Sequence, residues 1–473
     1  MPKRCATFCG NGAMVFSSLT FLFVFLPIAL LGCRVLPKQW RIGFLLLISL
    51  LFYAWGEPVY VLLMIGSILV NWGIGLAMDR FAARKKAWMI ASVVLNIGLL
   101  FFFKYTGFVW DMIRPLFGAP RVSIRLPIGI SFFTFQIMSY VIDVYRGNAR
   151  VQKNPILFGA YVSMFPQLIA GPIVRYVDIE AQLEAPDLSL SAFSDGIGQF
   201  LIGLAKKVLL ANAAGALWTQ LSGASEPNGV LGAWIGLLAY TFQIYFDFSG
   251  YSDMACGLGR MIGFRFVQNF NYPYLAESIT DFWRRWHISL STWFREYVYI
   301  PLGGNRKGVW RQILNLLIVW TLTGLWHGAS WNFVLWGLYF GVLLVVEKLF
   351  LQKLLRKAPA WIRHGYAMLL IMLGWGIFAI PAFGQMTAYM GSLFGIGNRG
   401  VLSDTAAAWT IGYLPTLIVC AAASLPVGKR LADRWRDRKW FPPVRVAVLA
   451  VLFGLCVASL AAQSYNPFIY FRF

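Results

Sequence analysis

The sequence predicts an all-α integral membrane protein that crosses the bilayer about nine to twelve times. Of its 473 residues, 59% are hydrophobic and only 13% are charged, and the mean hydropathy is +0.65. A chain of this composition has too little polar surface to cover a soluble globule. Apolar runs close to the length of a membrane-crossing helix recur along it. No alternating pattern suggests a barrel, so the crossings are expected to be helical.

Nine apolar runs stand out in chain order. They are Phe16 to Cys33, Ile42 to Tyr53, Val59 to Met78, Trp88 to Phe103, Val230 to Phe246, Ile313 to Val346, Tyr366 to Phe383, Trp409 to Leu425 and Val444 to Ala462. Between the second and third runs, the glycine and proline that flank Glu57 in 55-WGEP-58 predict a tight turn. Weaker segments near 128–142, 156–173 and 193–218 are candidates for crossing, re-entrant or interfacial helices.

The N-terminal residues indicate where the membrane domain begins. Residues 1–13 are basic and polar and do not resemble a signal peptide, so we expect an extension, with Met14 as an alternative start. A single membrane domain is expected over 14–473.

The basic clusters at 34–41 and 80–86 predict cytoplasmic loops. Basic loops facing anionic lipid headgroups account for much of the net charge of +22, and no nucleic-acid-binding module is present.

The segment from Asp281 to Glu296 predicts one amphipathic helix. At 100° per residue, its polar face carries Arg284, His287, Ser291 and Arg295, and an adjacent face carries aromatic and leucine side chains. A glycine-rich turn, 302-LGGNRKG-308, follows. We expect this region to bind the phosphates of an acyl donor such as coenzyme A, through Arg284, Arg285, Arg306 and Lys307. A basic flank that only obeys the positive-inside rule remains the alternative.

His327 lies inside the apolar run Ile313 to Val346, so it is expected near the middle of the membrane. An ionisable side chain at that depth is by default a candidate functional group. Burial favours a neutral imidazole, which can act as a general base. The alternative is a histidine that only hydrogen-bonds between helices.

Further polar residues are expected to support the two histidines. Asp247 and Asp253 are candidates to orient a histidine, to hold a polar acceptor or to pair with an arginine of the 284–306 region, and structural pairing is favoured. Asp281, Trp326 and Asn332 complete the candidate supporting residues. The six cysteines do not form a disulfide framework, and Cys5 and Cys9 lack the spacing and partners of a metal site.

Seven segments resemble the membrane-bound O-acyltransferase (MBOAT) family, and within it the bacterial branch that contains the alginate O-acetyltransferase membrane subunit. They are MVFSS at 14, LPIGISFFTFQIMSYVIDVYRG at 126, FPQLIAGPIVR at 165, YFDFSGYSDMACGLG at 245, DFWRRWHISLSTWFREYVYIPLGGNR at 281, GLWHGASWN at 324 and NPFIYFRF at 466. The resemblance implies a helical bundle around a central tunnel, with His327 as the catalytic histidine and His287 as the second family histidine.

The resemblance also implies a reaction. An acetyl group would pass from a cytoplasmic thioester, acetyl-CoA, to hydroxyls of an exported polysaccharide such as alginate or peptidoglycan, with no permanently bound cofactor. A periplasmic or membrane-anchored partner transferase and the bacterial inner membrane are implied as well. Three alternatives stay open: D-alanyl transfer to teichoic acid, a transporter of acyl groups or lipid-linked sugars, and a scaffold that recruits another acetyltransferase.

Overall fold

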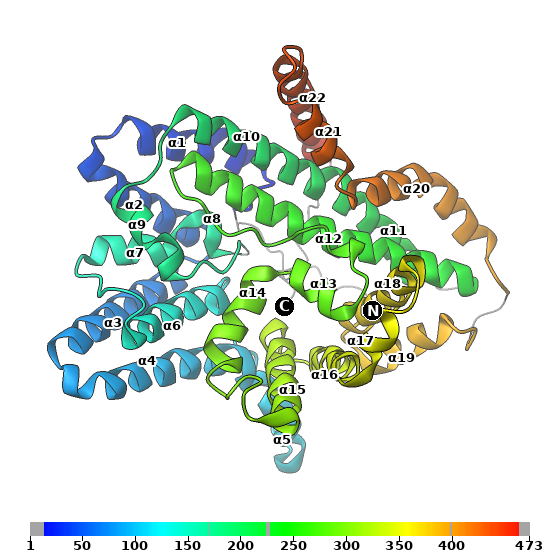
Figure 1. Ribbon diagram of the computed structural model, residues 1–473, viewed down its shortest axis with the longest axis horizontal. Coiled ribbons are helices and arrows are strands. Elements are labelled where there is room, and N and C mark those ends of the chain that lie inside the picture. The colour runs from blue at the N-terminus through cyan, green and yellow to red at the C-terminus, as the bar shows by residue number, and fades with distance from the viewer. Residues whose placement is uncertain (1–13, 170, 224–227, 398–399, 463–473) are drawn as a thin grey trace. The chain divides into compact units, whose positions relative to one another are not determined.

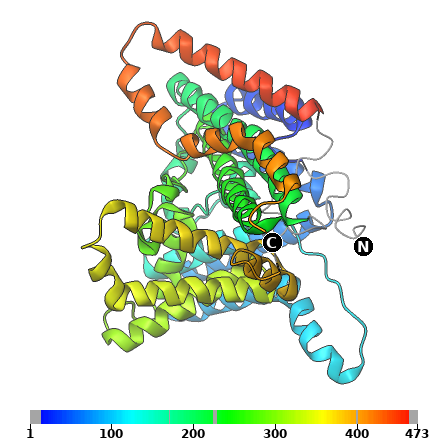
Figure 2. The same cartoon turned by 90° about the vertical axis from the view of Figure 1, so that its right-hand side faces the viewer.

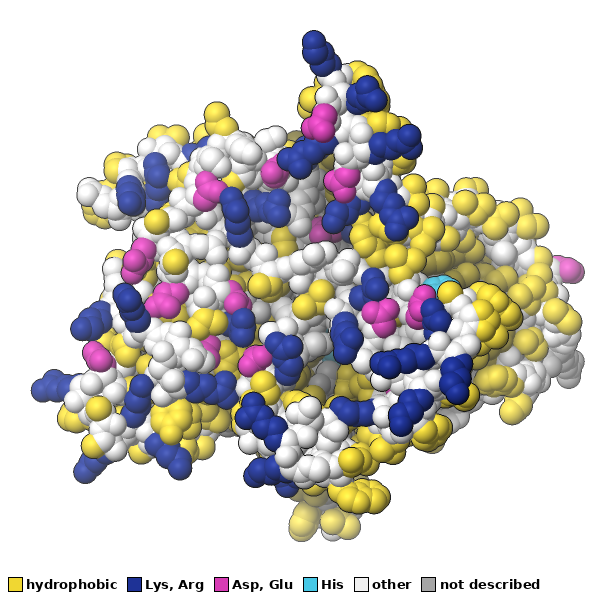
Figure 3. Space-filling model, in the orientation of Figure 1, with side chains coloured by type: hydrophobic (Ala, Val, Ile, Leu, Met, Phe, Trp, Pro, Cys, Tyr) yellow, Lys and Arg dark blue, Asp and Glu magenta, His cyan; other side chains and the backbone are white. Residues whose placement is uncertain are grey.

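The computed structural model describes residues 14–169, 171–223, 228–397 and 400–462 (Figures 1 and 2). Every regular element within these ranges is a helix, which confirms the predicted all-α class. The proposed extension, residues 1–13, and the terminal segment NPFIYFRF lie outside the described residues. Lysine and arginine side chains, dark blue in Figure 3, are spread over the viewed face, so much of the positive charge lies at the surface.

The described residues contain nine helices long and apolar enough to cross a membrane, which agrees with the predicted multi-pass architecture. They are Lys38–Gly56, Tyr60–Arg80, Ala82–Phe117, Leu190–Ser222, Gly229–Met261, Trp331–Leu355, Ala360–Ala379, Asp404–Ala423 and Phe441–Ala462. The first apolar run of the sequence forms a shorter helix, Phe21–Val35. The weak segment near 193–218 is among the nine candidates.

The chain divides into two compact units, each described here by itself. Among the described residues, unit 1 comprises 14–169, 171–204, 251–267 and 460–462, and unit 2 comprises 205–223, 228–250, 268–397 and 400–459. The helices of unit 1 are α1 Leu26–Val35, α2 Lys38–Gly56, α3 Tyr60–Arg80, α4 Lys85–Leu100, α5 Thr106–Ile113, α6 Ile130–Arg146, α7 Pro155–Ser163, α8 Phe165–Leu168, α9 Tyr176–Glu184 and α10 Leu190–Ala205. Helix α12, Gly229–Met261, belongs to unit 2 at its start and to unit 1 at its end.

Unit 2 contains the remaining α-helices, except that the last three residues of α22 belong to unit 1. They are α11 Asn212–Ser222, α13 Ile279–Arg285, α14 Ile288–Phe294, α15 Gly308–His327, α16 Trp331–Val346, α17 Gln352–Leu355, α18 Ala360–Ala379, α19 Phe383–Ser392, α20 Asp404–Ala423, α21 Val427–Trp435 and α22 Phe441–Ala462. Three π-helical turns also belong to it: Lys206–Ala211, Arg295–Tyr299 and Glu347–Leu351. Because π-helical turns are often found at functional sites, the charged residues on these turns are candidates for a functional role.

Aromatic packing forms the core of unit 1. The ring of Phe16 is fully buried and stacks on Tyr251, with centroids 4.5 Å apart. Phe21, Phe52 and Phe165 continue the same cluster. Helices α3, α4 and α6 lie side by side in this unit (Figure 1). The chain is therefore packed into the core almost from Met14 onward.

The predicted turn at 55-WGEP-58 is confirmed, since α2 ends at Gly56 and α3 begins at Tyr60. Glu57 is only 2% exposed, and its Oε2 lies 3.0 Å from Nη2 of Arg125. Burial raises the pKa of Glu57, and the nearby Arg125 guanidinium opposes that shift. The carboxylate in this turn thus holds the segment around Arg125 against the start of α3.

The apolar run Ile313 to Val346 is not one continuous helix. It forms a hairpin of α15 and α16, which lie side by side (Figure 2). The helix breaks after His327 because Gly328 takes an extended backbone conformation, φ −174° and ψ 155°. A Cβ at Gly324 would meet the backbone of Phe333 and come within 3.2 Å of the Cα of Gly337. His327 therefore sits at the turn of a tightly packed hairpin, and not in the middle of a helix.

Candidate acyl-transfer site

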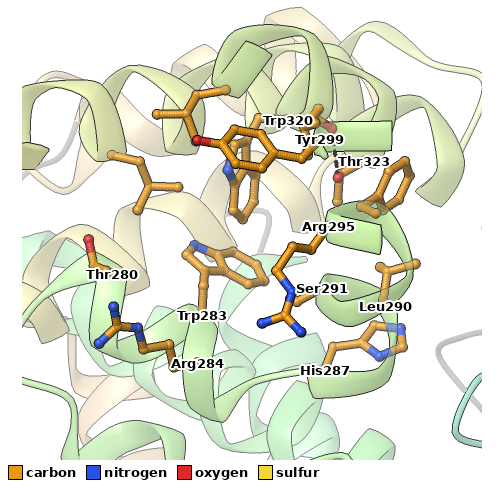
Figure 4. Close-up of a pocket in the computed structure, with 14 residues that line it drawn as sticks. Thr280, Trp283, Arg284, His287, Leu290, Ser291, Arg295, Tyr299, Trp320 and Thr323 are labelled. Carbon is orange, nitrogen blue, oxygen red and sulfur yellow. Dashed lines mark hydrogen bonds between the residues drawn. The ribbon is translucent and has the colours of Figure 1, made fainter. Parts of the chain in front are cut away.

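A cavity of about 230 Å³ lies within unit 2 (Figure 4). Its fourteen lining residues are Thr280, Trp283, Arg284, His287, Leu290, Ser291, Phe294, Arg295, Tyr299, Leu316, Val319, Trp320, Thr323 and Leu344. The lining is largely apolar and aromatic, with two arginines and one histidine. A mostly apolar cavity with a few convergent polar groups is typical of a small-molecule site.

The segment from Asp281 to Glu296 is two helices, so the prediction of one continuous helix is wrong. Helix α13 ends at Arg285 and α14 begins at Ile288. Between them, His287 adopts the left-handed conformation, with φ 46° and ψ 52°. That conformation is uncommon for a residue other than glycine and, where it persists, is held by its surroundings.

The predicted polar face nevertheless stays together in space. Arg284, His287, Ser291 and Arg295 all line the cavity. In Figure 4 the side chain of Arg295 extends into the space between Trp283 and His287. The bend at His287 thus preserves the grouping that helical periodicity predicts.

Asn269 fixes the orientation of the His287 ring. Its Oδ1 lies 3.1 Å from Nδ1 of His287 and accepts hydrogen bonds from the amide and hydroxyl of Ser289, at 3.1 and 2.9 Å. Because the Ser289 amide can only donate, the Asn269 atom that faces it is the carbonyl oxygen. His287 must therefore carry its proton on Nδ1 when it is neutral. Its Nε2 then holds a lone pair, and no hydrogen-bond partner for that atom exists among the described residues.

His287 is only 1% exposed. Burial lowers its pKa well below the usual value near 6.5, and His327 adds to that shift. A histidine in this environment is neutral at pH 7. Its Nε2 is accordingly a hydrogen-bond and proton acceptor inside the molecule.

His327 lies beside His287. Their ring centroids are 6.5 Å apart, and His327 is 7% exposed. The ring of Trp326 contacts both, at 5.1 Å from His327 and 5.9 Å from His287. Trp336 and Phe378 meet the His327 ring edge-on, at 5.1 and 5.4 Å. The two histidines that are 40 positions apart in the sequence are thus brought together in an aromatic enclosure.

Asn332 supports the hairpin turn that carries His327. Its Oδ1 accepts a 2.6 Å hydrogen bond from the Ser330 hydroxyl, and its Nδ2 donates to the carbonyl oxygen of Phe378 at 3.1 Å. Asn332 is itself 2% exposed. It therefore links the turn after His327 to the end of α18, whose Phe378 packs on His327.

The four basic residues predicted to bind a donor occupy different places. Arg284 lines the cavity. Arg285 is not among the lining residues, and its Nε donates to Oδ1 of Asp281 at 2.9 Å. Arg306 and Lys307 are exposed on the turn before α15 and do not line the cavity.

Sequence reasoning left Arg295 out of the donor-binding set although it lines the cavity. The helical-face pattern that groups it with His287 is the signal that could have identified it. Tyr299, four residues later, also lines the cavity, and its hydroxyl accepts a 3.1 Å hydrogen bond from Gln312.

Asp247 forms a buried ion pair, but with a different partner from the arginines considered for it. Its Oδ1 lies 2.5 Å from Nζ of Lys207, and the two side chains are 3% and 2% exposed. Asp253, six residues further along α12, is half-buried and belongs to unit 1. Structural pairing, the favoured interpretation, therefore describes Asp247. The described residues include no group of three His, Cys, Asp or Glu side chains that could hold a metal ion.

Comparisons with known proteins identify the family of this chain. The model of the membrane-bound O-acyltransferase (MBOAT) family matches residues 149–383. The chain is 38% identical over 488 residues to a probable alginate O-acetylase, AlgI, of Pseudomonas putida, covering 97% of this chain and 100% of that protein. It is 38% identical over 375 residues to the peptidoglycan O-acetyltransferase of Helicobacter pylori, covering 71% of this chain and 70% of that protein.

A more distant relative is the teichoic acid D-alanyltransferase of Bacillus subtilis, 28% identical over 296 residues, with 59% of this chain and 73% of that protein covered. The names of these relatives describe acyl transfer involving alginate, peptidoglycan and teichoic acid, respectively. The matched range 149–383 contains both histidines and every residue that lines the cavity. The chain therefore belongs to the membrane-bound O-acyltransferase family and is a multi-pass membrane enzyme that transfers acyl groups to oxygen.

Proposed function

We propose that this enzyme moves an acetyl group from acetyl-CoA to hydroxyl groups of an exported polysaccharide, at the bacterial inner membrane and with a periplasmic partner transferase. The names of the relatives support acetyl as the acyl group and a polysaccharide such as alginate or peptidoglycan as the acceptor. The single structural observation that carries the proposal is the cavity in which Arg284 and Arg295 share a lining with His287, beside His327.

The donor site follows from the chemistry of the lining. Guanidinium groups bind phosphate oxygens by charge-assisted hydrogen bonds, so Arg284 and Arg295 suit the phosphates of coenzyme A. The apolar walls formed by Trp283, Trp320 and Val319 suit the uncharged thioester arm. Arg306 and Lys307, on the exposed turn, extend the positive potential outward and attract an anionic donor. Arg285 holds Asp281 and so supports α13.

The transfer step needs a base. His327 takes the proton of the acceptor hydroxyl while that oxygen attacks the thioester carbonyl carbon. The tetrahedral intermediate then collapses, the C–S bond breaks, and the His327 imidazolium returns the proton to the departing thiolate. The products are an acetyl ester and free coenzyme A, so atoms and charge balance without a further reactant.

We assign to His287 the stabilisation of the His327 imidazolium. The Nε2 of His287 carries a lone pair because its Nδ1–H is committed to Asn269. A centroid separation of 6.5 Å is within reach of an N–H to N hydrogen bond bridged by one water. A neutral acceptor next to the base favours its protonated form during the reaction.

A deletion strain tests the proposal. It is complemented with wild type or with His327→Ala at equal membrane levels, and the base-labile acetate of each surface polysaccharide fraction is measured. We expect acetate to return only with wild type, and the restored fraction names the acceptor. Restoration by both would overturn catalysis by His327 and favour a transporter or a scaffold. Restoration of ester-linked D-alanine in place of acetate would instead identify a D-alanyl transferase.

A further inference from the structure

Glu347 is a completely buried carboxylate outside the cavity. It begins the π-helical turn Glu347–Leu351 that follows α16, and its exposure is 0%. Its Oε1 accepts hydrogen bonds from the amide of Ile279 at 2.6 Å and the hydroxyl of Tyr366 at 3.1 Å. Its Oε2 accepts from the amide and the hydroxyl of Thr280, at 2.9 and 2.6 Å. The carboxylate thus has two donors on each oxygen.

Two of these donors are the first amides of α13. The first amides of a helix have no partner within the helix and need an external acceptor. Ser278 supplies one, since its hydroxyl accepts from the amide of Asp281 at 3.0 Å. Glu347 supplies the acceptors for Ile279 and Thr280 from 68 and 67 positions away in the sequence, respectively. The negative charge also suits the N-terminal end of a helix.

Helix α13 leads directly into the cavity. Thr280, Trp283 and Arg284 line it, and the helix ends two residues before His287. Thr280 therefore joins the buried carboxylate to the cavity wall. A shift of the start of α13 would move Trp283 and Arg284 together, because a helix of seven residues moves as one body.

We propose that Glu347 is a positioning residue that anchors the start of α13 and so sets the placement of Arg284 and Trp283 for the acyl donor. This inference rests on the proposed function, since it assigns Glu347 a role in donor binding. Fixing the backbone of a short helix by an ionic acceptor is a strong constraint, because charge-assisted hydrogen bonds are roughly twice as strong as neutral ones. A cavity wall held in this way is preorganised for its ligand.

Glu347→Gln is the informative substitution because it keeps the size of the side chain. Its NH₂ group must face either the Ile279 amide or the Thr280 amide, so one buried donor loses its acceptor. Thr280→Val is a second variant that removes one hydroxyl donor and keeps the backbone contacts. Tyr366→Phe is the matched control, since it removes a hydrogen bond to the same carboxylate from a donor that is not part of α13 and leaves both oxygens free to accept from the α13 amides.

Two measurements on purified full-length protein in lipid nanodiscs test the proposal. The first is amide hydrogen exchange of peptides that cover residues 275–290. The second is the dependence of transfer on acetyl-CoA concentration, with the acceptor polysaccharide and the partner transferase supplied. We expect Glu347→Gln to speed exchange of the α13 amides and to raise the KM for acetyl-CoA about tenfold with a smaller change in kcat. Thr280→Val should change both in the same direction, and Tyr366→Phe should match wild type.

Faster exchange with an unchanged KM would overturn the proposal, because Glu347 would then stabilise the fold without positioning the donor site. Unchanged exchange would overturn it as well. If Glu347→Gln does not accumulate in the membrane, Thr280→Val decides the outcome. Absence of turnover by the wild type with acetyl-CoA, acceptor polysaccharide and partner transferase all supplied would overturn the proposed function, and the exchange measurement would still decide whether Glu347 anchors α13.

Discussion

The Oδ1 atom of Asn269 lies 3.1 Å from Nδ1 of His287 and fixes the tautomer of that histidine. The same oxygen binds both the amide and the hydroxyl of Ser289, so its orientation is determined by the α14 backbone. One asparagine thus controls the position of the bend at His287 and the identity of its basic nitrogen. Asn269 is 18 residues away in sequence, and its role was not anticipated from the sequence.

Asn269→Asp is expected to shift the pH dependence of transfer. A carboxylate in place of the amide still accepts from Ser289, so the local fold should persist. The new negative charge beside Nδ1–H favours the protonated imidazole and raises the pKa of His287 from its lowered value. Because the proposed reaction uses neutral His287, the acidic limb of kcat/KM should move to higher pH. The measurement is the pH profile of acetyl transfer in nanodiscs, and an unmoved limb would remove His287 from the reaction.

The lowered pKa of His287 also predicts a loss of stability in acid. In the unfolded chain its pKa is about 6.5, so the unfolded state binds a proton that the folded state excludes. The contribution of His287 to stability is therefore present above about pH 6.5 and is lost as the pH falls below it. His287→Asn removes the titrating group, and asparagine tolerates the left-handed backbone at this position.

The check is thermal unfolding in detergent at pH 7.5 and 5.5. Wild type should lose more thermal stability between these two pH values than His287→Asn does. Equal losses would show that His287 does not contribute to acid sensitivity.

His327→Ala should reduce acetyl transfer by roughly 10²–10⁴-fold, the usual contribution of a general base. His364→Ala is the matched control, because His364 is the third histidine and lies outside the cavity lining, with its Nδ1 3.2 Å from the carbonyl oxygen of Ala276. The measurement is the initial rate of acetyl transfer at saturating acetyl-CoA. Equal effects of both substitutions would indicate a structural role for His327.

Arg295→Gln tests the donor site. Since Arg295 extends into the cavity, its loss should raise the KM for acetyl-CoA about tenfold, with kcat changed less. Arg284→Gln should act in the same way. Arg265→Gln removes an exposed arginine that pairs with Asp187 in unit 1 and should leave the KM unchanged. A KM that stays constant in Arg284→Gln and Arg295→Gln would exclude these arginines as donor ligands.

Helical periodicity in the sequence predicts which side chains share a face, but it does not predict where a helix bends. Helical periodicity grouped Arg284, His287 and Arg295 correctly, because the side-chain directions on either side of the bend still converge on one cavity. The bend itself was missed, since no sequence signal marks a histidine for positive φ. The helix end at His327 has no strong signal in the sequence, because the run around it is apolar throughout and Gly328 alone marks the break.

The supporting residues depend on contacts that are distant in sequence. Glu347 contacts α13 from 67 positions away, and Asp247 pairs with Lys207 from 40 positions away. No pattern within a window of one helix can predict such pairs. Their positions become visible only once the helices are packed.

The ion pair of Lys207 and Asp247 gives the last prediction. Both side chains are at least 97% buried, so removing one partner leaves an uncompensated charge in the interior. Asp247→Asn or Lys207→Met should each cost about 3–5 kcal/mol of stability. Replacing both, as Lys207→Met with Asp247→Leu, should cost less than either single change, because neither charge is then buried alone. The measurement is a double-mutant cycle of unfolding in mixed micelles. Additive losses would show that the two residues do not stabilise each other, and their contact at 2.5 Å would then carry no coupling energy.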